Sequence, residues 1–284
     1  MITRRIIARL DIKGSNLVKG IHLEGLRVLG DPGDFAQFYY ESGADELFFQ
    51  DVVASLYERN SLHDIISRTA RRGFIPLTVG GGIRTIEDIK GVLRAGADKV
   101  ALNTAAVKNP QIIKEAVHKF GSSTIVVAIE CIRQPNGQYG AFVDNGREET
   151  GKEVLAWAQE VERLGAGEIV LTSVDREGTG KGYDLELTEM VTTAVGIPVI
   201  AHGGAGRLEH FSEAIATGKA DALAVASVIH YDFVKNSSKM AFDNHTEGNL
   251  SFLQSGRTSF SQIQAAGIPK IKEYLLQAGF DCRI

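Results

Sequence analysis

The stretch FIPLTVGGGIRTIEDIKGVLRAGADKVALNT, residues 74–104, decides the fold of this chain. It starts with a short apolar run at residues 75–79, which is typical of a buried parallel strand. Three glycines follow at residues 80–82, and Thr85 then precedes a segment whose apolar side chains recur on one helical face. A glycine ends that segment, and a second apolar run begins at Lys99. The stretch therefore predicts a strand, a glycine turn, a helix and a second strand.

The same pattern recurs about 120 residues further along the chain, as an internal repeat would. IPVIAHGGAGR at residues 197–207 is followed, after a helical segment, by ADALAVAS at residues 220–227. A glycine turn between a strand and a helix can bind phosphate, because backbone amides and the helix dipole face the anion. One such turn could equally be a tight turn without a ligand. Two turns in matching halves indicate a substrate with two phosphates.

Composition and charge exclude several classes of protein. The 284 residues contain no Pro-rich, Ser-rich or charge-rich linker and suffice for one α/β barrel, which typically needs about 250. A net charge of −4 without a basic stripe argues against nucleic acid as a partner. The N-terminal apolar run is too short for a signal peptide or a membrane span, and Cys131 and Cys282 form no metal-type pair. We expect a cytoplasmic protein without a membrane, metal or cofactor partner.

Alternating strand and helix patterns continue along the whole chain. Strands are expected at residues 5–11, 46–52, 75–79, 99–103, 124–130 and 168–173, with two more that end at His202 and Ala226. Eight strands alternating with helices, in two matching halves, favour a closed (β/α)8 TIM barrel over an open doubly wound sheet. We therefore predict that residues 1–284 form a single barrel.

Three connections depart from this regular pattern. Residues 12–30 make a long loop, carrying Lys19, that could close over an anionic ligand. Residues 131–150 contain a strong turn signal at residues 135–137, which predicts a small hairpin over the barrel. Residues 230–267, after strand eight, are polar and rich in Asn and Ser. This insertion is either a lid, a docking surface or a solvated loop without a special role.

Two carboxylates stand at equivalent strand ends of the two halves. Asp11 ends the first expected strand and Glu130 the fifth. Active sites of such barrels lie at the C-terminal ends of the strands, so both groups are placed for general acid/base chemistry. Each could instead cap a helix or pair with a local arginine. Their symmetric position between two phosphate turns favours catalysis.

Charged residues also mark the opposite end of the barrel. Each lies at or beside the start of an apolar strand: Arg5, Glu46, Lys99 and Glu168. Four such charges either form a salt-bridged plug of the barrel floor or a gate whose ion pairs can exchange.

The motifs as a set are similar to the cyclase subunit of imidazole glycerol phosphate synthase, the HisF family. The resemblance covers the chain outside residues 230–267 and rests on RIIARLDI, VKG, GADELFFQDV, PLTVGGGIR, AGADKVALNTAAV, IVVAIE, GAGEIVLTS, GYDLEL, HGGAG and ADALAVASVIH. It implies a TIM-barrel lyase of histidine biosynthesis that forms a heterodimer with a HisH-like glutaminase and uses its ammonia. The implied reaction converts a bis-phosphorylated aminoimidazole carboxamide ribonucleotide (PRFAR) to imidazole glycerol phosphate and AICAR.

The resemblance also assigns roles to residues. Asp11 matches a catalytic aspartate, with Glu130 as its partner, and the floor charges match the ammonia gate. The remaining matches concern substrate and phosphate binding: Lys19, Gly82, Asn103, Thr104, Glu177, Gly204, Ala226 and Ser227.

Four residues differ from the family pattern, and all are expected on the catalytic face. Glu130 and Glu177 stand where aspartates are usual, His202 replaces a serine and Arg9 a cysteine. Three functions fit this mixture: the histidine-pathway cyclase, a paralogue that supplies ammonia to another pathway such as surface-sugar amidination, and a non-catalytic ammonia-conducting partner. A related isomerase shares the half-barrel repeat, but the charged floor counts against it.

Overall fold

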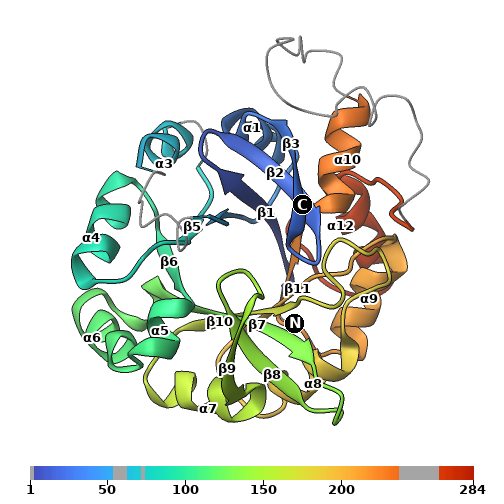
Figure 1. Ribbon diagram of the computed structural model, residues 1–284. Helices are drawn as coiled ribbons and strands as arrows, with labels where there is room; N and C mark the ends of the chain where they lie inside the picture. Colours follow the sequence, from blue (N-terminus) through green and yellow to red (C-terminus); the bar gives the residue numbers. More distant parts are fainter. Residues whose placement is uncertain (1–2, 54–62, 72–73, 237–261) are drawn as a thin grey trace.

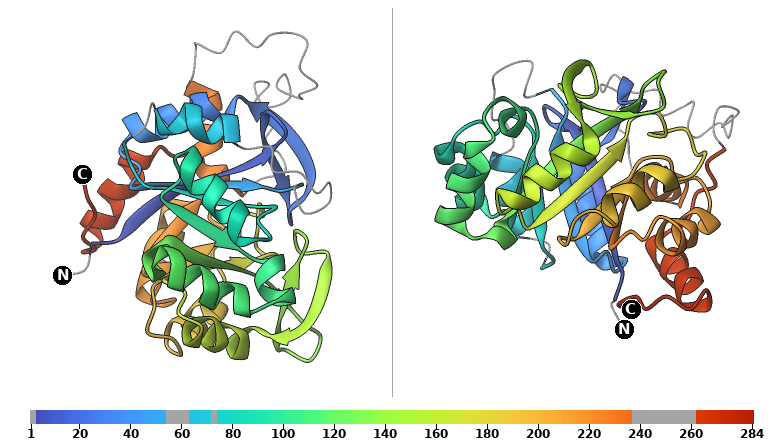
Figure 2. Two further views of the ribbon diagram at one scale, coloured as in Figure 1. Left: turned by 90° about the vertical axis from the view of Figure 1, so that its left-hand side faces the viewer. Right: turned by 90° about the horizontal axis from the view of Figure 1, so that it is seen from below.

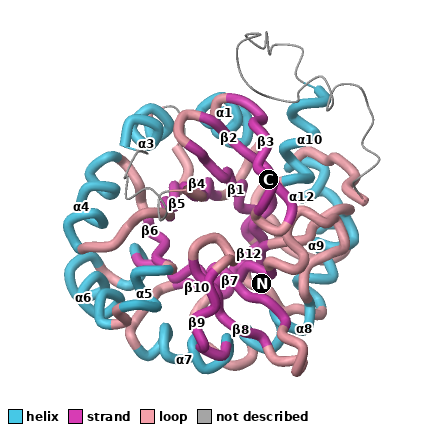
Figure 3. The backbone as a smooth tube through the Cα atoms, in the orientation of Figure 1, coloured by secondary structure: helices cyan, strands magenta, loops and turns pink. Residues whose placement is uncertain are grey.

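The computed structural model describes residues 3–53, 63–71, 74–236 and 262–284. Parallel strands form a closed barrel with helices outside it (Figure 1 and Figure 3). In order around the barrel the strands are β1 (Arg5–Lys13), β4 (Glu46–Asp51), β5 (Leu77–Gly80), β6 (Lys99–Leu102), β7 (Ile125–Arg133), β10 (Glu168–Ser173), β11 (Val199–His202) and β12 (Ala222–Val225). Pairing of β12 with β1 and of β7 with β10 closes the ring, so the predicted (β/α)8 barrel is confirmed.

The helices lie on the outer face of the strands, as the apolar stripes of the sequence require. They are α1 (Pro32–Glu41), α3 (His63–Ala70), α4 (Ile86–Ala95), α5 (Thr104–Lys108), α6 (Gln111–Phe120), α7 (Val154–Arg163), α8 (Leu185–Thr192), α9 (Leu208–Ala216), α10 (Ser227–Asn236) and α12 (Ile268–Gln277). A 3-10 turn at Ser122–Thr124 precedes β7. The short helix α5 was not expected from the sequence. None of the helices in the described ranges is long and apolar enough to cross a bilayer.

Two β-hairpins project from one end of the barrel. The first, β2 (Asn16–Ile21) and β3 (Glu24–Gly30), pairs antiparallel with the end of β1. The expected loop at residues 12–30 is therefore wrong: its alternating apolar residues extend the sheet. The second consists of β8 (Tyr139–Val143) and β9 (Glu148–Glu153). The turn predicted at residues 135–137 joins β7 to β8, which pair antiparallel, so the hairpin predicted within residues 131–150 is confirmed. Both chain ends lie at the opposite end of the barrel (Figure 2).

The segment after strand eight also differs from the sequence prediction. Helix α10 continues to Asn236, so the polar insertion does not begin at His230, which is fully buried. Apolar residues on the inner face of α10 override the polar composition that follows them. Residues 237–261, the greater part of the expected insertion, lie outside the described residues. Residues 262–267 lead into α12, which packs against α9.

The glycine turn after β5 forms as predicted, and a capping box stands at the start of the helix that follows it. Thr85 and Asp88 form a capping box at the start of α4, and Gly96 ends the helix at φ +119°. Asp88 also accepts hydrogen bonds from the amides of Arg84 and Thr85, at 3.0 and 2.9 Å. Three amides at the start of α4 are therefore bonded within the chain, and the phosphate site expected at this turn stays a prediction.

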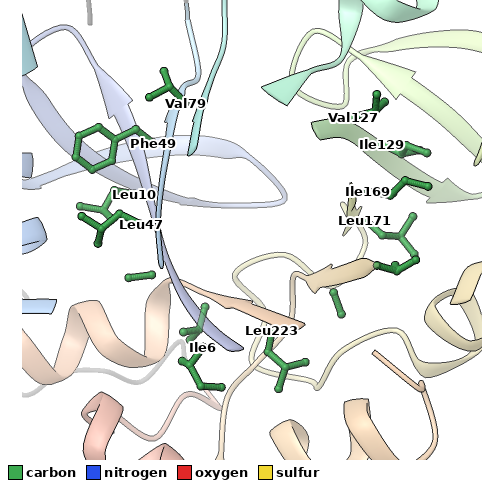
Figure 4. Close-up of a cluster of buried hydrophobic side chains, with 14 of the residues drawn as sticks. Ile6, Leu10, Leu47, Phe49, Val79, Val127, Ile129, Ile169, Leu171 and Leu223 are labelled. Carbon is green, nitrogen blue, oxygen red and sulfur yellow. The ribbon is translucent and has the colours of Figure 1, made fainter. Parts of the chain in front are cut away.

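Strand alternation divides the buried side chains into two sets. One set points outward and packs against the helices, for example Leu10, Leu47 and Ile129 (Figure 4). The other set points into the barrel, where the side chains form a compact apolar layer: Ile7, Phe48, Ala101, Val126, Val170, Ile200, Ala222 and Ala224. Because side chains alternate with a period of two, the charged residues above and below this layer also point inward.

Gly81 lies where only glycine fits. Its φ is +97°, and a Cβ atom there would lie 2.2 Å from the carbonyl oxygen of Asp51, whereas Gly43, at φ +82°, has open space around that position. We expect Gly43→Ala to cost about 1 kcal/mol of unfolding free energy through backbone strain alone. Gly81→Ala should cost roughly 3 kcal/mol, because strain and overlap add. Denaturant unfolding of both variants would measure this, and equal costs would contradict the steric argument.

Candidate active site

The polar residues of the barrel mouth come from inward positions near the ends of the strands. Arg9 and Asp11 lie on β1, Glu130 on β7, Thr172 on β10 and His202 on β11. All five are buried, with exposed fractions between 1% and 8%. Thr172 and Glu130 are direct neighbours in the pairing of β10 with β7. The closed sheet thus brings together residues that are far apart in the sequence.

The guanidinium of Arg9 links three of these side chains. Its Nε donates to Oδ1 of Asp11 at 3.0 Å. Its Nη1 lies 3.1 Å from Nδ1 of His202 and 3.3 Å from Oγ1 of Thr172. The Thr172 hydroxyl is in turn 3.2 Å from the same His202 nitrogen. Arg9 therefore connects β1 with β10 and β11 across the mouth.

Arg9 also sets the charge of its neighbours. Burial alone would raise the pKa of Asp11, but Arg9 and Lys19 outweigh burial and hold that pKa below its ordinary value. Burial lowers the pKa of His202 well below its ordinary value, and Arg9 and Lys19 lower it further. Asp11 is therefore an anion and His202 a neutral ring at neutral pH.

Glu130 has the opposite electrostatic environment to Asp11. Burial raises its pKa to about 7, because the single hydrogen bond from the Gly146 amide, at 2.8 Å, and the charge of Arg9 offset burial only in part. Asp11 and Asp144 raise this pKa further by repulsion. The two predicted catalytic carboxyls thus differ in protonation: Asp11 is ionised, whereas Glu130 holds a proton for much of the time near neutral pH. Such a difference is the signature of an acid/base pair.

A cavity of about 440 Å³ opens at the mouth on the side of the first glycine turn. Among the residues that line it are Gly81, Gly82, Asn103, Thr104, Lys108, Asp144, Arg9 and Glu130. The structure therefore brings the predicted residues Gly82, Asn103, Thr104 and Glu130 to one cavity. Asp11 is not among the described residues that line it, but it is hydrogen-bonded to Arg9, which does.

The second glycine turn lines a much smaller cavity, of about 10 Å³. Gly203 and Gly204 have φ values of +98° and +104°, and Ala226 and Ser227 close the opposite side, where α10 begins. Glu177 and Gly178 also line it. The predicted residues Gly204, Ala226, Ser227 and Glu177 therefore meet here, in a space about the size of one water molecule. A phosphate is larger than this space, so its entry requires residues that line the cavity to move.

Lys19 and Glu177, both expected to bind substrate, pair with each other in this structure. Their side chains form a buried ion pair. Glu177 also accepts a hydrogen bond from the Leu23 amide at 3.1 Å, and its carbonyl accepts one from the His22 amide at 3.0 Å. Burial lowers the pKa of Lys19, but Glu177 and Asp11 outweigh it and raise that pKa overall. The pair fastens the β2–β3 hairpin to the loop after β10.

The two hairpins meet above the mouth. Asn145, in the turn between β8 and β9, donates to the carbonyl of Leu23 at 2.8 Å. His22 contacts the carbonyl of Val174 through Nδ1, also at 2.8 Å. Asp144 and Asn145 have positive φ values, which these two residue types tolerate. Sequence reasoning missed the roles of Asn145 and Gly146; the Asp-Asn-Gly turn was the available signal.

The four floor charges form a closed ring of ion pairs. Arg5 lies 2.5 Å from Glu46 and 2.9 Å from Glu168, while Lys99 lies 3.2 Å from Glu46 and 3.1 Å from Glu168. The structure thus brings all four predicted gate residues together. Their side chains retain 7% to 25% exposure. The apolar layer of the barrel interior separates this ring from the polar mouth.

In the described part of the chain, no cluster of three or more His, Cys, Asp or Glu residues is arranged to hold a metal ion. Both cysteines are free, and Cys131 is buried.

Comparison with known proteins adds an independent line of information. A family model described as "Histidine biosynthesis protein" matches residues 5–235. The chain is 58% identical over 208 residues to a Legionella pneumophila protein named imidazole glycerol phosphate synthase subunit HisF, covering 73% of this chain and 98% of that protein. It is 49% identical over 234 residues to the protein of the same name from Alkaliphilus metalliredigens, covering 82% and 93%.

The environment of Glu130 makes a direct prediction. The infrared absorption of the protonated Glu130 carboxyl should be present below neutral pH and be lost as the pH rises through about 7. The absorption is assigned to Glu130 by its absence in Glu130→Gln. Infrared difference spectroscopy would follow this absorption across a pH titration. Replacing Arg9 with Met should move the transition to higher pH, because Arg9 lowers the pKa of Glu130. A transition near the ordinary value for glutamate would contradict the burial argument.

Proposed function

We propose that the barrel mouth is the active site of a cyclase. The chain belongs to the family of histidine biosynthesis proteins and, within it, to the cyclase subunits of imidazole glycerol phosphate synthase. The protein is thus a lyase of histidine biosynthesis. The proposed substrate is PRFAR, which reacts with ammonia to give imidazole glycerol phosphate and AICAR. One observation carries the proposal: two buried carboxyl groups at one mouth have pKa values displaced in opposite directions.

The displaced pKa values assign a role to each carboxyl group. Asp11, held ionised by Arg9, is the proposed general base, which accepts a proton as ammonia adds to the substrate. Glu130, with a pKa of about 7, is the proposed general acid, which donates a proton to the leaving group. Glu130 lines the large cavity, whereas Asp11 is hydrogen-bonded to Arg9, which also lines it. Arg9 occupies Oδ1 of Asp11, so the proposed base acts through Oδ2 or after Arg9 moves.

The two glycine turns are the proposed phosphate sites. The large cavity offers Gly82, Asn103 and Thr104, with Lys108 as a nearby cation. The small one offers Gly204, Ala226 and Ser227 at the start of a ten-residue helix, where the helix dipole favours an anion. For Lys19 and Glu177 we propose contact with substrate only after their ion pair opens.

The floor ring is the proposed entrance for ammonia from a glutaminase subunit. The ring alternates in charge around Arg5, Glu46, Lys99 and Glu168. The ring can therefore open when its side chains exchange ion-pair partners, without exposing apolar side chains to water. The apolar layer above favours neutral ammonia over ammonium, because burying an unpaired charge there is costly. The proposed partner is a HisH-like glutaminase that docks at this floor, and the two free cysteines support the proposed cytoplasmic location.

The residues that differ from the family pattern have separate partners in this structure. Glu177 pairs with Lys19, His202 with Arg9, and Glu130 with the Gly146 amide. Two of them, Glu177 and His202, line the small cavity, and the other two, Arg9 and Glu130, line the large one. No observation favours the paralogue or the non-catalytic partner over the cyclase.

Substitution of the two carboxyls tests the proposal. With PRFAR and an ammonium salt, Asp11→Asn should lower turnover at least 100-fold, since general acid/base groups contribute about 10²–10⁴. Glu130→Gln should lower it similarly, while Glu130→Asp should keep measurable turnover because the acid remains. In the parent, turnover at constant free ammonia should fall as the pH rises through about 7, where Glu130 loses its proton. Absence of any turnover in the parent would overturn the proposal.

Ammonia supply is tested at the floor. The isolated chain should use ammonium salts but not glutamine, because no glycine-flanked nucleophile turn surrounds Cys131. Lys99→Met should lower glutamine-driven turnover at least tenfold in complex with a glutaminase subunit of imidazole glycerol phosphate synthase, while ammonium-driven turnover changes little. Lys90→Met is the matched control, since Lys90 makes an exposed ion pair on α4. Equal effects of both variants would rule out a special role for the ring.

A further inference from the structure

His202 and Arg9 form a pair whose geometry fixes the proton of the histidine ring. The Nη1 of Arg9 lies 3.1 Å from Nδ1 of His202. Arginine has only donors, so Nδ1 must accept this hydrogen bond. A neutral imidazole that accepts at Nδ1 carries its proton at Nε2. The ring is neutral because burial, and then the charges of Arg9 and Lys19, lower its pKa well below the ordinary value.

His202 also lines the second cradle, defined here as the small cavity lined by residues 202–205 and 224–227 together with Glu177 and Gly178. His202 is 4% exposed and both of its hydrogen-bonded neighbours, Arg9 and Thr172, meet Nδ1. The fixed tautomer therefore leaves an Nε2–H donor for whatever occupies the cradle. A phosphate oxygen is an acceptor that such a donor can bind.

We propose that His202 is a phosphate-binding residue of the second cradle, that its Nε2–H donates to the phosphate, and that Arg9 is the positioning residue that holds this tautomer. This inference rests on the proposed phosphate site and extends it to two residues at which the chain differs from its family pattern. The ligand class is a phosphate monoester.

The surrounding charges are compatible with an anion in this place. Glu177 also lines the cradle, but its charge is compensated by the buried ion pair with Lys19. The charge of Arg9 is likewise balanced by Asp11. The cradle thus relies on neutral donors and the start of α10, and it needs no protonated histidine.

The tautomer can be measured without turnover. In ¹⁵N-histidine-labelled parent, the His202 signal, assigned by its loss in His202→Gln, should show the Nε2-protonated neutral ring. Inorganic phosphate should shift that signal and the amides of Gly204 and Ser227, but leave the ring of His230 unchanged, since His230 lies in the core. Arg9→Met should produce a mixture of tautomers and weaken phosphate binding several-fold. A purely structural Arg9 would leave the tautomer unaltered.

The affinity for inorganic phosphate, measured from the shifts of the Gly204 and Ser227 amides, then shows whether His202 binds the phosphate. We expect His202→Ala to weaken it about tenfold or more, as loss of a hydrogen bond to a charged group would. His202→Gln should keep most of the affinity, because its amide can accept from Arg9 and donate to phosphate. An Nδ1-protonated ring in the parent, or unchanged affinity in His202→Ala, would overturn this inference alone. No phosphate response at Gly204 and Ser227 in any variant would overturn the second phosphate site and this inference together.

Discussion

The closure of a parallel sheet into a barrel forces every second side chain inward, and the rest of the structure depends on this constraint. On β1 the inward positions are Arg5, Ile7, Arg9 and Asp11, which lie in the floor ring, the apolar layer and the mouth in turn. The other strands supply partners at the same levels. A shift of one residue in any strand would carry its charges into the helix-facing core. The register that stabilises the barrel is therefore also the register that assembles the site.

Charge in this barrel is confined to two levels, and each level balances itself. The floor has two cations and two anions in a closed ring. At the mouth, Arg9 faces Asp11 and Lys19 faces Glu177. Glu130 is the exception, because its nearest donor is a backbone amide rather than a cation. Its buried carboxyl consequently keeps a proton for part of the time near neutral pH, which is the property that an acid catalyst requires.

The sequence predicts what depends on periodicity and fails where tertiary contacts decide. The barrel, the two halves and the inward position of the floor charges follow from apolar runs and their spacing. Sequence alone could not show that Thr85 and Asp88 bond three amides at the start of α4, because a capping box competes with a ligand for such amides. Nor could it show that Lys19 pairs with Glu177, since that contact joins residues from opposite halves of the chain. The β2–β3 hairpin was missed because it has no strong turn signal.

The two departures Arg9 and His202 lie at the same barrel mouth because each is the other's hydrogen-bond partner. A buried arginine needs several acceptors, and a carboxylate alone leaves part of its guanidinium without a partner. The imidazole of His202 supplies a further acceptor on β11, and the Thr172 hydroxyl another on β10. A serine at residue 202 would have a shorter reach toward the same guanidinium. The two residues are thus complementary: changing His202 alone would leave a buried cation short of an acceptor, and changing Arg9 alone would take the arginine donor away from Nδ1 of His202. In this sense the departures at residues 9 and 202 are a single adaptation of the mouth.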